Sequence, residues 1–124
     1  MLFRSRIRVL ANDRVDIPNV KGAQSAVVSG DPKKGPYAML VKWPAGFNPP
    51  LHTHPNTVKV LVVSGTFLHG DDGQQRKELG SGSYVVIPAM TKHVSSCKEG
   101  AECVFFVEGT GKFATTPVED KKEK

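Results

Sequence analysis

The amino-acid sequence predicts an all-β protein in which many short strands form one barrel or sandwich. Its 124 residues suit a single domain, and glycine and proline, at twelve and nine residues, interrupt the chain too often for long helices. No segment repeats its apolar residues with the 3.6-residue period of a helix. The domain is expected to span residues 1–116, and the charged residues 117–124 are expected to form a flexible tail.

Three strands are expected in the first part of the chain. Residues 3–10 alternate basic with mostly apolar side chains, which is the pattern of a strand with one solvated face. A turn-rich stretch follows and contains a short strand at 24–29. Residues 37–43 form a third strand, whose alternate side chains are expected to share one face: Tyr37, Met39, Val41 and Trp43.

The central part of the chain is expected to continue as extended segments joined by turns. Residues 47–55 are extended because their prolines fix the backbone. Residues 58–64 are an almost continuous β-branched run, which is typical of a strand buried on both faces. Shorter strands are expected at 66–69, 75–79 and 83–87, separated by glycine-rich turns.

A last hairpin is expected from residues 92–97 and 103–107, with a five-residue loop between Cys97 and Cys103. The two cysteines would then lie opposite each other on paired strands. A disulfide is open to them in an oxidising compartment, whereas buried thiols are the favoured state in the cytosol.

The charge distribution argues against nucleic-acid binding. The net charge is +5, but the basic residues are scattered beyond an arginine-rich stretch in the first fourteen residues. No concentrated basic face with interleaved aromatic residues is expected. The sequence also contains no apolar stretch of about 18 residues and no visible signal peptide, so neither a membrane span nor export is indicated. A cytoplasmic location is favoured, and a periplasmic one would require a signal peptide that has been removed.

A histidine pair points to metal binding. His52 and His54 lie on one extended segment, where side chains two residues apart share a face at about 6.6 Å. Two imidazoles at this spacing can converge on one ion, although two surface histidines would show the same pattern. The surroundings favour the metal site, because five residues separate Gly46 from His52 and ten residues separate His54 from Gly65.

A second block of regular spacing follows, in which Gly82, Pro88 and His93 are separated by five and four residues. Together the two blocks cover residues 46–97 and resemble the two motifs of the RmlC-like cupin superfamily. The first cupin motif is Gly-x5-His-x-His, followed by a Glu and a Gly. The second is Gly-x5-Pro-x-Gly-x2-His-x3-Asn. The resemblance implies a cupin β-barrel, a jelly-roll-like double-stranded β-helix. It also implies a metal ion inside the barrel, bound by His52, His54 and His93.

Three positions depart from the cupin motifs. The glutamate position falls on Val58, or on Lys59 if the count shifts by one, and neither can replace a carboxylate ligand. Met90 replaces a turn glycine, so a different turn shape is expected. Cys97 replaces an asparagine four residues after His93, roughly 13 Å along the strand, and is interpreted as a small core residue.

A site with three neutral imidazoles leaves a divalent ion its full +2 charge, which favours an anionic chelating ligand. Three positions would stay open on a six-coordinate ion, two for the chelator and one for dioxygen. Such sites are similar to those of the acetylacetone-cleaving and thiol dioxygenases, and the stretches Ser64–Phe67 and Gly109–Phe113 resemble the acetylacetone-cleaving type. Fe(II) is the favoured metal, and Zn, Ni, Mn and Cu remain open.

Four residues are interpreted as the wall of a substrate pocket: Val58, Phe67, Tyr84 and Phe105. Aromatic residues at strand spacing are also typical of an ordinary core. His69, Asp71 and Asp72 are interpreted as a solvated loop.

Other functions are left open beside a dioxygenase with a β-diketone-like substrate. They are a non-catalytic cupin that binds or senses a small molecule, a zinc-dependent hydrolase or isomerase, and a degenerate cupin without metal. A homodimer is expected, in which residues 1–10 pair at a sheet edge; the alternative is an ordinary intramolecular strand.

Overall fold

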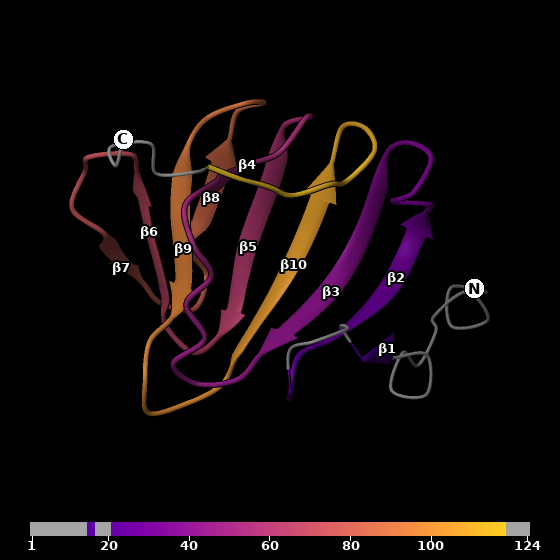
Figure 1. The fold of residues 1–124 in the computed structure, drawn as a ribbon. Helices are drawn as coiled ribbons and strands as arrows, with labels where there is room; N and C mark the ends of the chain where they lie inside the picture. Colours follow the sequence, from indigo (N-terminus) through magenta and orange to yellow (C-terminus); the bar gives the residue numbers. More distant parts are fainter. Residues whose placement is uncertain (1–14, 17–20, 119–124) are drawn as a thin grey trace.

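A computed structural model describes residues 15–16 and 21–118, and these form eleven strands and no helix (Figure 1). The strands are β1 (Val15–Asp16), β2 (Gln24–Gly30), β3 (Tyr37–Trp43), β4 (His52–Thr53), β5 (Val58–Ser64), β6 (Phe67–Asp71), β7 (Lys77–Leu79), β8 (Tyr84–Ile87), β9 (His93–Cys97), β10 (Cys103–Gly109) and β11 (Thr116–Pro117). The described residues therefore include no helix that could cross a membrane. The predicted all-β class is confirmed.

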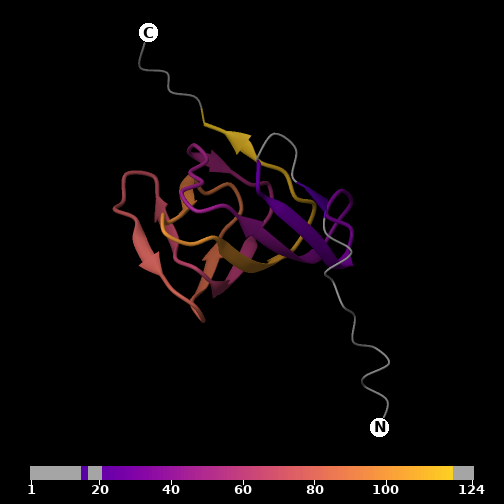
Figure 2. The ribbon, with the colours of Figure 1, turned by 90° about the horizontal axis from the view of Figure 1, so that it is seen from below.

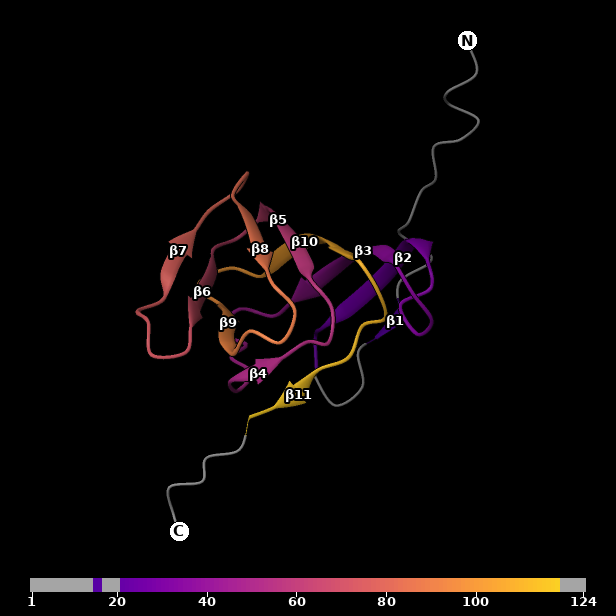
Figure 3. The ribbon, with the colours of Figure 1, turned by 90° about the horizontal axis from the view of Figure 1, so that it is seen from above.

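The strands form two antiparallel sheets. One has six strands in the order β1-β2-β3-β10-β5-β8, and the other has five in the order β11-β4-β9-β6-β7. Figures 2 and 3, seen from below and from above, show the two sheets curving around a shared interior. Apolar side chains from both sheets fill that interior, among them Met39, Val60, Phe67 and Phe105. This is the arrangement of a double-stranded β-helix.

Strands β3 and β5 have the bounds predicted from the sequence. In β3, Tyr37, Met39 and Val41 are buried on one face, as expected from their alternation. Strand β5 was expected to be buried on both faces, and this is wrong. Leu61 and Val63 are 36% and 48% exposed, because in the described residues nothing covers the outer face of the six-stranded sheet.

The predicted last hairpin is also wrong. Strand β9 pairs with β4 and β6, whereas β10 pairs with β3 and β5, so residues 98–102 pass from one sheet to the other. Cys97 and Cys103 are joined by a disulfide across this passage, with Cα atoms 5.9 Å apart, and are not the expected free thiols. Closing such a short loop stabilises the fold by about 2 kcal/mol.

The structure describes the two ends of the chain only in part. The strand predicted at 3–10 and its role in a dimer lie outside the described residues. Near the C-terminus, β11 pairs with β4, and the Val118 N–H donates a hydrogen bond to the Leu51 carbonyl at 2.9 Å. Backbone hydrogen bonds therefore hold the chain against the barrel as far as residue 118.

Candidate metal centre

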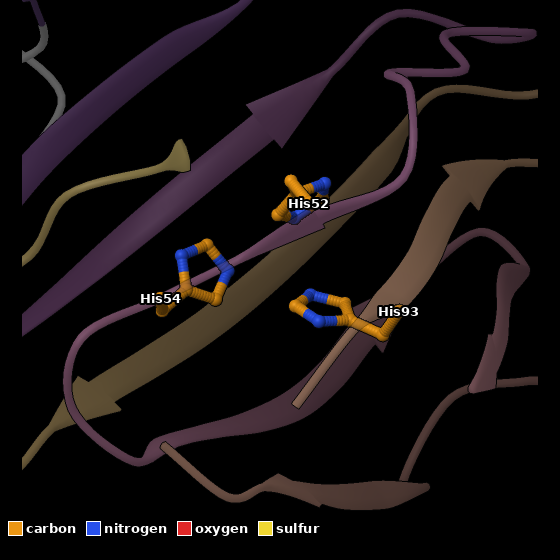
Figure 4. Close-up of side chains that lie close together, drawn as sticks. All are labelled: His52, His54 and His93. Carbon is orange, nitrogen blue, oxygen red and sulfur yellow. The ribbon is translucent and has the colours of Figure 1, made fainter. Parts of the chain in front are cut away.

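Strands β4 and β9 bring three histidines together. His52 and His93 are directly paired across the two strands, and their ring centroids are 4.3 Å apart. His54, two residues after His52, lies with its ring 4.8 Å from that of His52 and 5.0 Å from that of His93. Figure 4 shows the three rings gathered between these segments. Pairing between strands far apart in the sequence thus completes the cluster that the spacing predicts.

Each of the three rings is held by a backbone carbonyl. The Nδ1 atoms of His52, His54 and His93 lie 2.7, 2.9 and 2.9 Å from the carbonyl oxygens of Pro50, Ala114 and Thr91, respectively. A carbonyl oxygen can only accept, so Nδ1 carries the hydrogen in all three rings. The three Nε2 atoms therefore keep free lone pairs, which is the tautomer that a metal ligand needs.

Burial favours the neutral form of two of these imidazoles, His54 and His93. It lowers the pKa of His93 to about 4 and also holds the pKa of His54 below its usual value. The His93 side chain is nearly inaccessible, and its Nε2 atom has no hydrogen-bond partner. An orphaned buried nitrogen costs free energy unless something binds it. Since the three histidines offer nitrogens within 4.8 Å of one another, the residues fit a divalent metal ion.

The carboxylate of the cupin motif has no counterpart in the cluster. Val58 is buried in the core on the inner face of β5, paired with Ile87. Lys59 points to the opposite face, where its register partners are Val86 and Glu108. Within the described residues, no Asp or Glu joins the three-histidine group. In the described part of the chain, the group therefore offers imidazole ligands only.

Met90 keeps the backbone conformation of the glycine that it replaces. Its φ is 64°, the left-handed region that favours glycine, so the change of turn shape expected from the sequence is not required. The Met90 N–H donates to the His54 carbonyl at 2.8 Å. This bond links the turn before β9 to the segment that carries His54. The left-handed backbone conformation of Met90 costs about 1 kcal/mol.

His69 is not part of a solvated loop, as the sequence interpretation had it. It lies in β6 with 14% of its side chain exposed, and its ring centroid is 5.6 Å from that of His93. Asp72 is exposed in the turn that follows, as expected, whereas Asp71 is exposed but is the last residue of β6. The alternation from Phe67 to His69, which places both on the inner face, was the signal that could have identified it.

The four predicted pocket residues occupy different places. Tyr84 is 58% exposed and pairs with Leu61 on the outer face, so its assignment to the pocket is wrong. Phe105 is packed in the core against Trp43 and Phe67, with centroids 5.0 and 4.7 Å away. Val58 and Phe67 are buried on the inner face of the barrel.

Phe113 is a site residue that the sequence reasoning did not assign. Its ring lies 5.0 Å from that of His54 and packs edge-on against Tyr37 at 5.9 Å. The segment that carries Phe113 also supplies the Ala114 carbonyl to His54. The chain between β10 and β11 therefore both orients His54 and shields one side of its ring.

Comparison with known proteins agrees with the fold. A family model described as "Domain of unknown function (DUF4437)" matches residues 11–123. No significant match is found among curated proteins.

Several solved structures have the same fold. An RmlC-like cupin protein from Ralstonia eutropha is 27% identical, with a TM-score of 0.70 over 100% of this chain and 80% of that one. An RmlC-like cupin with a double-stranded β-helix fold from Methanocaldococcus jannaschii is 15% identical, with a TM-score of 0.63 over 85% and 91%. The polyketide cyclase RemF from Streptomyces resistomycificus is 19% identical, with a TM-score of 0.73 over 94% and 88%. The fold is that of an RmlC-like cupin.

Proposed function

Because the chain belongs to the DUF4437 family and has the cupin fold, we propose that it binds a divalent metal ion and, through it, a small anionic chelating molecule. The observation that carries the proposal is the set of three neutral imidazoles, His52, His54 and His93, each fixed through Nδ1 so that Nε2 is free. No carboxylate joins this group in the described part of the chain, so the charge of the ion is left to attract an anion.

The favoured reaction is cleavage of a β-diketone-like anion by dioxygen. Fe(II) at this site would supply Lewis acidity and the redox chemistry of the cleavage. The protein would bind the metal through the three histidines and would exclude water with the apolar side chains of Val58, Phe67 and Phe113. The alternative is a cupin that binds or senses the same class of molecule without turnover.

The proposal can be tested by titrating acetylacetone into protein reconstituted with Fe(II) under anaerobic conditions and then admitting oxygen. One ion per chain, a saturable absorbance change and oxygen uptake in proportion to diketone are expected. The same protein loaded with redox-inert Zn(II) is the control and should bind the diketone without oxygen uptake. Binding without uptake in the Fe(II) form would support the non-catalytic alternative, and failure to bind metal would contradict both.

We also propose that the protein is a homodimer whose contact includes residues 1–10. Two observations support this: β1, which follows that segment, is the edge strand of the six-stranded sheet, and the outer face of this sheet exposes Leu61, Val63 and Tyr84. Deleting residues 1–10 is expected to convert a dimer to a monomer in sedimentation velocity. A truncated chain that sediments as a dimer would contradict the proposal.

A further inference from the structure

The fourth histidine of the chain belongs to the same region as the other three. His69 lies on β6, which pairs with β9, and its register partner Ser95 is two residues from His93. The ring is fixed on two sides, because it stacks parallel to Phe67 with centroids 6.0 Å apart and contacts the buried Ser95 hydroxyl through Nδ1 at 3.0 Å. All four histidines of the sequence therefore lie near one end of β9.

The surroundings of His69 favour the opposite tautomer to that of the three ligand candidates. Their Nδ1 atoms face carbonyls and must carry the hydrogen, whereas Nδ1 of His69 faces a hydroxyl that can donate to it. Its Nε2 atom lies 3.9 Å from the Asp71 carboxylate, which can only accept. In the tautomer with its hydrogen on Nε2, Nδ1 accepts from the Ser95 hydroxyl and the Nε2–H faces the Asp71 carboxylate. A nitrogen that carries hydrogen cannot bind a metal ion.

The same hydrogen is available to another acceptor. A separation of 3.9 Å is too long for a hydrogen bond, so Asp71 does not occupy the Nε2 position of His69. His69 is also outside the group of three whose nitrogens lie within 4.8 Å of one another. His69 therefore lies beside the cluster as a partly exposed side chain, next to the three buried histidines.

We propose that His69 is the anion-binding residue of the site, donating its Nε2–H to an oxygen of the chelating molecule that the metal holds. This rests on the proposed function and extends it, because it assigns recognition of the bound anion to one side chain. Ser95 would act as a positioning residue, since its hydroxyl fixes the His69 ring from the adjacent strand.

The test compares an anionic with a neutral chelator on the Zn(II)-loaded protein. His69→Phe keeps a planar ring without a donor and is expected to weaken acetylacetonate binding about tenfold or more, the usual worth of a hydrogen bond to a charged group. The affinity for 2,2′-bipyridine should change less than twofold, because this chelator offers no anionic oxygen. The dissociation constant of the metal should also change less than twofold. His69→Gln retains an N–H donor and should restore part of the acetylacetonate affinity, while Ser95→Ala should show an intermediate loss.

The outcomes separate this inference from the proposed function. If His69→Phe weakens metal binding itself, or weakens both chelators equally, His69 is not an anion donor and the inference is overturned, while the three-histidine site stands. If the wild-type protein binds no metal, or binds metal but no acetylacetonate, the proposed function fails and the inference with it. Melting temperatures of the metal-free variants show that each one is folded before its titration is interpreted.

Discussion

Replacing His93 with alanine is expected to remove most of the metal affinity. Metal binding at four-ligand zinc sites amounts to about 10–16 kcal/mol, so one ligand corresponds to roughly 2.5–4 kcal/mol, on the order of a hundredfold in Kd. His93 has a further role, because it lies directly opposite His52 and its ring contacts both other imidazoles. Its loss would leave His52 and His54 as an incomplete pair.

The measurement is the metal Kd by competition with a coloured chelator, together with the rise in melting temperature that metal causes. The wild type should be stabilised by metal, because a ligand that binds only the folded state shifts the unfolding equilibrium, and His93→Ala should show little such rise. Lys59→Ala is the matched control, since Lys59 lies on the opposite face of β5. If Lys59→Ala lost its metal while His93→Ala retained it, the alignment of this sequence with the first cupin motif would be wrong.

The sequence was informative wherever the structure depends on local pattern. The apolar run at residues 37–43, ended by turn residues, placed β3 with its bounds, and the period of two along a strand placed Tyr37, Met39 and Val41 on one buried face. The resemblance to the two cupin motifs implied that His52, His54 and His93 lie together, and the structure brings them together. Burial of Val58 on the inner face also followed from its parity with the histidine pair.

The errors arose where pairing between distant strands decides the structure. Residues 92–97 and 103–107 are joined by a short loop, which locally indicates a hairpin, but β10 finds its partners in β3 and β5. The disulfide therefore links the two sheets, which no local pattern could show. The assignment of Tyr84 to the pocket was wrong for another reason. Every residue of β8 is apolar or aromatic, so the sequence does not show which alternate side chains face inward.

Replacing Val58 with glutamate is expected to change both the metal affinity and the ligand preference of the site. Val58 is buried on the inner face of β5, at the position where the cupin motif carries its carboxylate. In the metal-free variant, the buried carboxyl group has no partner and should destabilise the fold by a few kcal/mol. With metal present, an ionised ligand is added to a divalent cation, so the affinity should rise about tenfold or more.

Binding of an anionic chelator should change in the opposite direction. The net charge of the loaded centre falls from +2 to +1, which halves the Coulomb attraction for an anion, and one open position is lost. The measurements are the metal Kd, the melting temperature with and without metal, and an anaerobic acetylacetone titration. Val58→Gln, of nearly the same size but neutral, is the control and should share the loss of packing without the gain in metal affinity. If Val58→Glu bound metal no better than Val58→Gln and acetylacetone no worse, residue 58 would not face the ion. The electrostatic argument for an anionic ligand would then lose its basis.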